Sequence, residues 1–396
     1  MKNHFNFISS SSARQCLASL AVAAVFGVTA CDSSNKNTTS SDSTSVDSSV
    51  TTTQTTDVAN KGGNPDDVKP KGPKPAWGSD IKPQMQAVIE KLASYGDKPI
   101  PQLTAVQARK NHTPTDAVKD LMKEYNIPMP VMKVDTMGKE IPVNGGNVHI
   151  RVYTPQGATG PLPVIVYYHG GGFVIANIDV YDSSAKALSD QVGAVVVSVA
   201  YRLAPEHRFP VAHNDSFAAY QWVLNNAASI KGDPKKIAVV GESAGGNLAT
   251  NVAIMARDKK IQAPLHVVSV YPIASADMFS ASYNKYIEAK PLDKAMMMWF
   301  TKNYTNTMAE AKDPRLNLVA ANLKGLPSFT IINAELDPLQ SDGEMLESKL
   351  KAAGVTVDRK VYDGVTHEFF GMGALVPEAK EALSYAASQL KDAFNK

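Results

Sequence analysis

A serine held between two glycines at a strand-to-helix junction constrains this chain more than any other feature. Residues 237–240 form an apolar, largely β-branched run that is typical of a buried parallel strand. The next five residues read GESAG, and apolar residues then recur at helical spacing over 248–256. Strand, tight turn and helix therefore follow one another directly. This order predicts an α/β fold in which Ser243 stands clear of the sheet.

The pattern Gly-x-Ser-x-Gly is that of the nucleophile elbow, in which the serine occupies a strained turn. Gly241 and Gly245 suit this turn because a side chain at either position would collide with the crossing strand and helix. The pattern also occurs by chance in glycine-rich turns. The flanking strand and helix favour the interpretation of Ser243 as a nucleophile.

A run of three glycines forms a second motif. The strand-like segment 163–169 leads directly into HGGGF at 169–173. Consecutive glycines leave backbone N–H groups that a ligand can approach closely. A flexible loop would have the same composition, but an H-G-G-G loop also builds the oxyanion hole of lipases and esterases. The serine motif downstream favours this second interpretation.

Three carboxylates and one histidine follow the last two predicted strands. Glu335, Asp337 and Asp342 come after the first of these strands, and His367 follows the second. Ligand-facing groups belong at the carboxyl ends of strands in an α/β sheet. Each carboxylate is therefore a candidate partner of the histidine. Asp337 is favoured because Glu335 is close to the strand end and Asp342 is expected inside the next helix.

Five motifs together resemble the hormone-sensitive-lipase-like branch of the α/β-hydrolases, the bacterial family IV carboxylesterases. They are HGGGF at 169–173, YRLAPEH at 201–207, GESAGGN at 241–247, DPL at 337–339 and H-x-F at 367–369. The resemblance covers the chain from about residue 80 onward. Glu242 is a departure, since the family more often has Asp or Thr there. The resemblance implies an α/β-hydrolase fold, with a mostly parallel central sheet flanked by helices and a small helical cap.

The resemblance also implies roles for the site residues. Ser243 is expected to be the nucleophile, His367 the base and Asp337 the acid, in the chain order of this fold. The oxyanion hole is expected to use the backbone N–H groups of Gly171, Gly172 and Ala244. Supporting positions in the two motifs are His169, Gly170, Gly241 and Gly245. The resemblance implies neither a metal ion nor an organic cofactor.

The N-terminal segment 1–30 resembles a bacterial lipoprotein signal peptide. Basic residues precede an unbroken run of apolar and small residues over 16–30, which at about 15 residues is short for a membrane span. The run ends in VTAC, so Cys31 is expected to become a lipidated N-terminus. The alternative is an ordinary cleavage site near Ala30. Cys31 is favoured because the chain has 2 cysteines and the other lies in the removed segment, which leaves no disulfide partner.

The rest of the chain divides into a tether and a hydrolase domain. Residues 31–78 are rich in Ser and Thr and then in Pro, Lys and Gly, so they are predicted to be a disordered tether. The hydrolase domain is predicted at 79–396, with cap segments at about 79–130 and 274–314. Apolar spacing predicts helices over 81–95, 115–125 with Thr115 as its N-cap, 292–304 and 377–394.

The predicted function is hydrolysis of short- to medium-chain carboxylic esters by an enzyme anchored in the bacterial envelope through Cys31. Without lipidation, the same enzyme would be secreted. An amidase or deacetylase acting on N-acyl or xenobiotic substrates would use the same three side chains and stays open. A non-catalytic receptor on this fold would lack one of them. The formal net charge of +2 gives no electrostatic argument for binding nucleic acid.

Overall fold

The computed structural model describes residues 62–396. The predicted signal peptide, Cys31 and most of the predicted tether lie outside the described residues. None of the helices between residues 62 and 396 is long and apolar enough to span a membrane.

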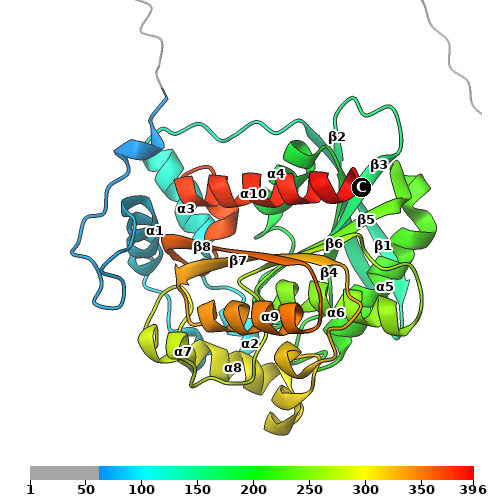
Figure 1. The fold of residues 1–396 in the computed structure, drawn as a ribbon. Helices are drawn as coiled ribbons and strands as arrows, with labels where there is room; N and C mark the ends of the chain where they lie inside the picture. Colours follow the sequence, from blue (N-terminus) through cyan, green and yellow to red (C-terminus); the bar gives the residue numbers. More distant parts are fainter. Residues whose placement is uncertain (1–61) are drawn as a thin grey trace, which may run out of the picture. The chain divides into compact units, whose positions relative to one another are not determined.

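A single sheet of eight strands runs through the described part of the chain (Figure 1). The spatial order is β1-β2-β4-β3-β5-β6-β7-β8. The first pairings, β1 with β2 and β2 with β4, are antiparallel, and the remaining pairings are parallel. The strands are β1 (Val134–Val143), β2 (Gly146–Pro155), β3 (Leu162–Tyr168), β4 (Val195–Ala200), β5 (Gly232–Glu242), β6 (His266–Val270), β7 (Ser328–Leu336) and β8 (Val357–Thr366). The predicted mostly parallel sheet is confirmed.

Helices pack on both faces of this sheet (Figure 1). The helices α4 and α10 lie on one face together with α1 and α3, and α5, α6 and α9 lie on the other. The helices are α1 (Pro83–Ser94), α2 (Ala105–Ala108), α3 (Pro114–Glu124), α4 (Asp182–Val192), α5 (Val211–Asn226), α6 (Ala244–Asp258), α7 (Ala281–Lys285), α8 (Lys294–Tyr304), α9 (Gln340–Ala352) and α10 (Pro377–Phe394).

The central strands are apolar on both sides because both faces of the sheet are covered. In β3, Val164 and Val166 belong to the core beneath α5 and α6, while Ile165 and Tyr167 belong to the core beneath α4 and α10. All four side chains are fully buried. This is why the central strands read as continuous apolar runs rather than as alternating ones.

The prediction of a tether extending to residue 78 is wrong over its last part. The Glu90 carboxylate accepts the backbone N–H groups of Lys71 and Gly72 at 2.6 and 3.0 Å. The N–H of Gly63 donates to the carbonyl of Asn126 at 2.8 Å, and Val68 is fully buried. Residues 62–78 therefore pack on α1 and the end of α3. Two of their backbone N–H groups are satisfied by a distant carboxylate, which the composition could not reveal.

The N-cap of the second predicted helix is Thr113 and not Thr115. The hydroxyl of Thr113 accepts the N–H of Asp116 at 3.3 Å, and the Asp116 carboxylate accepts the N–H of Thr113 at 2.8 Å. This reciprocal pair is a capping box, and Pro114 occupies the first helical position, which suits a residue without an N–H. The other three predicted helices, α1, α8 and α10, are present within two residues of their expected bounds.

Candidate active site

Ser243 lies in a strained turn between β5 and α6. Its φ and ψ are 57° and −115°, a conformation that L-residues rarely adopt. A Cβ at Gly241 would lie 2.0 Å from the carbonyl oxygen of Gly245, and a Cβ at Gly245 would lie 2.0 Å from that of Tyr168. Both positions therefore require glycine. The turn presents the side chain of Ser243 beyond the carboxyl end of the strand.

Ser243, His367 and Asp337 form a continuous hydrogen-bonded relay. Nε2 of His367 lies 2.9 Å from Oγ of Ser243, and Nδ1 of His367 lies 2.7 Å from Oδ2 of Asp337. A carboxylate can only accept, so Nδ1 carries the proton and Nε2 is free to accept the hydroxyl proton of the serine. The three side chains are almost completely buried. Residues from three separate strand ends are thus brought together in the arrangement that nucleophilic catalysis requires.

The surroundings of His367 stabilise its protonated form. Burial alone lowers the pKa of the imidazole, but the charge and hydrogen bond of Asp337, together with the charges of Glu368 and Glu242, outweigh this effect. The pKa of His367 is therefore raised above its usual value. Asp337 itself is held from the other side, because its Oδ1 accepts the N–H of Leu339 at 2.9 Å.

The two other candidate carboxylates bind elsewhere. Glu335 accepts the backbone N–H of Gly364 at 2.8 Å. Asp342 lies in the first turn of α9, and one of its oxygens accepts the N–H groups of Ala274 and Ser275, each at 2.9 Å. Burial raises the pKa of Asp342 to about 8. Neither side chain hydrogen-bonds to the histidine: Glu335 holds the backbone of β8, and Asp342 holds the segment after β6.

The three-glycine loop lies beside Ser243. Gly171 and Gly172 have φ values of 97° and 59°, which favour glycine. Their N–H groups make no hydrogen bond to protein within residues 62–396. Ala244 is the first residue of α6, so its N–H also has no partner inside the helix. These are the three N–H groups predicted to form an oxyanion hole.

The supporting residues of this loop hold its backbone in place. Nδ1 of His169 lies 2.7 Å from the carbonyl oxygen of Gly170, and Tyr201 donates its hydroxyl to the carbonyl of His169 at 2.8 Å. The two rings stack, with centroids 4.3 Å apart. A Cβ at Gly170 would lie 2.2 Å from the hydroxyl oxygen of Tyr181. His169 therefore helps to fix the backbone of the loop, and Gly170 leaves the space that the hydroxyl of Tyr181 occupies.

Comparison with known families identifies the fold. A family model described as the alpha/beta hydrolase fold matches residues 165–371, which is more than half of the chain. The chain belongs to the α/β-hydrolase family. Among curated proteins, this hydrolase is similar to carboxylesterase NlhH of Mycobacterium tuberculosis, with 38% identity over 253 residues that cover 63% of this chain and 79% of the relative. It is also similar to ethyl acetate hydrolase of Pseudomonas putida, with 35% identity over 255 residues that cover 63% of this chain and 79% of the relative.

Solved structures show the same fold. An esterase of Pyrobaculum calidifontis is similar with a TM-score of 0.71 and 35% identity, covering 79% of the hydrolase and 98% of that chain. A thermostable esterase of Pseudomonas putida is similar with a TM-score of 0.74 and 31% identity, covering 82% of the hydrolase and 99% of that chain. The predicted α/β-hydrolase fold is confirmed.

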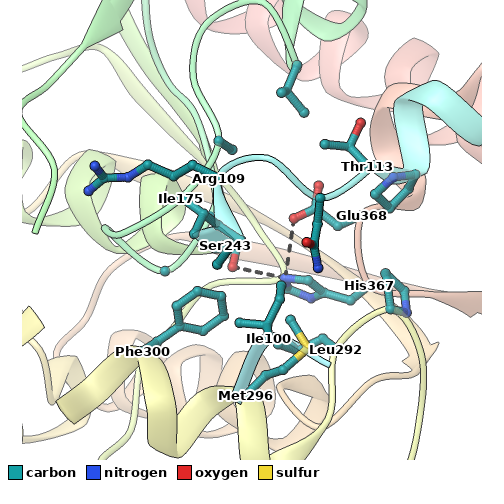
Figure 2. Close-up of a pocket in the computed structure, with 18 of the residues that line it drawn as sticks. Ile100, Arg109, Thr113, Ile175, Ser243, Leu292, Met296, Phe300, His367 and Glu368 are labelled. Atoms are coloured by element: carbon teal, nitrogen blue, oxygen red, sulfur yellow. Dashed lines mark hydrogen bonds and ion pairs between the residues drawn. The ribbon is translucent and has the colours of Figure 1, made fainter. Parts of the chain in front are cut away.

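Ser243 and His367 open into a largely apolar cavity of about 360 Å³ (Figure 2). Its walls come from both predicted cap segments, with Ile100 from the first and Met296 and Phe300 from the second. The two segments are joined where the indole N–H of Trp299 donates to the carbonyl of Leu103 at 3.0 Å. The hydrolase therefore has an apolar chamber directly above its serine.

The chamber also contains a carboxylate that the sequence analysis missed. Glu368 lines the cavity, and its Oε1 lies 4.0 Å from Nε2 of His367 (Figure 2). Tyr181 donates its hydroxyl to the two carboxylate oxygens, at 2.6 and 2.7 Å. The position of Glu368 directly after His367 was a visible signal in the sequence. Tyr181 lies far from Glu368 in the chain, so the sequence gave no signal of their contact.

Proposed function

We propose that this hydrolase is a serine carboxylesterase that cleaves short- to medium-chain esters through an acyl-enzyme on Ser243. The chain is a carboxylic ester hydrolase, in keeping with its carboxylesterase and esterase relatives. The observation that carries the finer proposal is the relay from Ser243 through His367 to Asp337, with distances of 2.9 and 2.7 Å.

In the proposed first half-reaction, Oγ of Ser243 attacks the ester carbonyl carbon while Nε2 of His367 takes the hydroxyl proton. Asp337 keeps the ring oriented and stabilises the imidazolium. The N–H groups of Gly171 and Gly172 and that of Ala244 are proposed to bind the oxyanion. The imidazolium then gives its proton to the departing alkoxide oxygen as the ester C–O bond breaks.

In the proposed second half-reaction, water replaces the alcohol. His367 removes a proton from the water, whose oxygen attacks the acyl carbon. The bond between that carbon and the oxygen of Ser243 breaks, and the serine regains its proton from the imidazolium. The carboxylic acid leaves, and the enzyme returns to its starting state.

The size of the chamber supports a preference for short and medium acyl chains. A smaller cavity of about 40 Å³ lies behind it. Four residues line both spaces and separate them: Gly172, Ile273, Met297 and Phe300. Since the chamber is closed on this side by packed side chains, long chains would have to displace part of the wall.

Hydrolysis of p-nitrophenyl esters from acetate to palmitate by the purified protein would test this proposal. We expect the highest kcat/KM with the shorter chains and a steep fall toward palmitate. p-Nitroacetanilide should be included, because an amidase would cleave this amide at a rate comparable to the acetate ester. A best rate with palmitate, or with the anilide, would contradict the proposed substrate class.

We further propose that the enzyme is anchored in a bacterial envelope through a lipid on Cys31 and is held by the chain segment that follows it. The support is the sequence itself, in which small residues and then Cys31 close an apolar run. Two or more acyl chains give stable anchoring, and a lipoprotein cysteine would meet this condition. Without the modification, the proposed form is a secreted soluble esterase.

A further inference from the structure

We infer that Glu368 selects esters whose alcohol part carries a positive charge, such as a protonated amine. The inference rests on the proposed ester hydrolysis and extends it to the substrate class. Its basis is the position of one carboxylate inside an apolar chamber, beside the imidazole nitrogen that must protonate the departing alcohol.

Glu368 is the only carboxylate among the described residues that line the chamber. Its side chain is 20% exposed, and it accepts a hydrogen bond from the neutral hydroxyl of Tyr181. Within residues 62–396, its only ion-pair contact is the imidazole of His367, at 4.0 Å. The carboxylate therefore has no permanent cation beside it.

Arg109 is the only other permanently charged side chain among the described residues that line the chamber, and it is already engaged. The guanidinium of Arg109 donates to both carboxylate oxygens of Glu206, at 2.9 and 2.7 Å, and to the carbonyls of Val174 and Ala204. Figure 2 shows Arg109 pointing away from Ser243. These contacts leave Glu368 as the charge that a bound molecule would meet.

The location of Glu368 places this charge within reach of the departing alcohol. In the proposed mechanism, the alcohol oxygen must come within about 3.2 Å of Nε2 of His367 to receive its proton. Oε1 of Glu368 lies 4.0 Å from the same nitrogen. The leaving oxygen is therefore within about 7 Å of the carboxylate. A short carbon spacer on the alcohol oxygen can therefore place a cationic group next to the carboxylate of Glu368.

Electrostatics favour a cation in this position. Burial and the charge of Asp337 raise the pKa of Glu368 above its usual value, although the charge of His367 and the hydroxyl of Tyr181 lower it in part. A substrate cation would favour the ionised form, whereas an anionic ester would meet like charge. Ionisable groups that interact with Glu368 come from several elements: Tyr181 before α4, Tyr167 on β3, Glu242 on β5, Tyr201 after β4, Tyr271 after β6, Asp337 after β7 and His367 after β8.

A matched pair of substrates tests the inference. 2-(Dimethylamino)ethyl acetate and 3-methylbutyl acetate have the same shape, but only the first is cationic near neutral pH. We expect the wild type to favour the cationic ester, and Glu368→Gln to reduce the ratio of the two kcat/KM values by about tenfold or more, as for one charge-assisted contact. The control Glu344→Gln, at an exposed position on α9, should leave the ratio unchanged.

The outcomes separate the inference from the proposed function. If 3-methylbutyl acetate is hydrolysed but the ratio is the same in the wild type and in Glu368→Gln, the inference is wrong and the esterase proposal stands. If the wild type hydrolyses no ester, both fail. A second measurement needs no variant: 2-(dimethylamino)ethanol should inhibit the wild type more strongly than 3-methyl-1-butanol. Equal inhibition by these two alcohols would overturn the inference.

Discussion

The ring of Phe300 occupies the space that a side chain on Gly172 would need. A Cβ at Gly172 would lie 2.3 Å from the Cδ1 and Cγ atoms of Phe300. A residue of the cap helix α8 is thus in close contact with the loop proposed to bind the oxyanion. Phe300 also separates the substrate chamber from the smaller cavity behind it.

Phe300→Ala should shift the acyl-chain preference toward longer p-nitrophenyl esters. Removing the ring would join the two cavities, so that a longer chain could enter without displacing the wall. The substitution deletes a buried aromatic ring and should cost about 3–5 kcal/mol of stability, so folding must be checked by thermal unfolding. Met298→Ala, at an exposed position of the same helix, is the control. An unchanged chain-length profile in folded Phe300→Ala would contradict the role of this wall.

Ser243→Ala should abolish turnover and leave the fold intact, because the hydroxyl contributes chemistry and almost no packing volume. The loss expected for a nucleophilic serine is on the order of 10⁶ in kcat, the magnitude known for subtilisin. Steady-state assays with p-nitrophenyl acetate, together with circular dichroism, measure both effects. Residual activity above a few per cent in a clean preparation would exclude Ser243 as the nucleophile.

Asp337→Asn should reduce the rate by on the order of 10⁴, as in the corresponding serine-protease substitution, because the amide no longer fixes the His367 tautomer. Glu335→Gln and Asp342→Asn should cost far less, since these side chains bind backbone N–H groups away from the histidine. The three variants should be compared by kcat/KM at one pH. A larger loss in Glu335→Gln than in Asp337→Asn would identify a different acid.

The pH dependence of kcat/KM should respond to Glu368. Only neutral His367 can accept the serine proton, so activity falls as the pH drops through the pKa of His367. The negative charge of Glu368 raises this pKa, and Glu368→Gln should therefore move the acid limb to lower pH. Full pH profiles with the uncharged substrate p-nitrophenyl acetate give the comparison. If the acid limb of Glu368→Gln stays at the wild-type pH, or moves to higher pH, the charge of Glu368 does not raise the pKa of His367.

Cys31→Ser should move the enzyme out of the membrane fraction without changing its specific activity, because the substitution lies outside the described hydrolase. Two acyl chains contribute roughly 0.8 kcal/mol for each buried CH₂ group, and this contribution would be lost. Intact mass spectrometry of the membrane-extracted wild type measures the modification directly. A mature N-terminus other than Cys31, or Cys31 without added acyl mass, would instead support a secreted soluble esterase.

Features that depend on local sterics can be predicted from the amino-acid sequence alone. The turn around Ser243 requires glycine at 241 and 245, and the loop before it requires glycine at 171 and 172. At Gly241 and Gly171 the clash would be with backbone only four residues further along, and the positive φ values of Gly171 and Gly172 are local as well, so these requirements leave fixed patterns in the chain. The clashes at Gly245 and Gly172, with Tyr168 and Phe300, are set by the fold. Apolar runs predicted the central strands for a similar reason, since burial on both faces excludes polar residues from them.

Which side chains contact one another depends on how the chain folds. Three carboxylates lie within eight residues of one another, and their partners come from distant segments: His367 for Asp337, Gly364 for Glu335, and the 274–275 backbone for Asp342. The same holds for Glu90, which orders residues 71–72, and for Tyr181, which holds Glu368. Hydrogen bonds form between atoms that are close in space, and chain folding sets that closeness. The sequence pattern therefore identifies the candidate side chains, whereas the packing of the sheet and the cap determines which groups they contact.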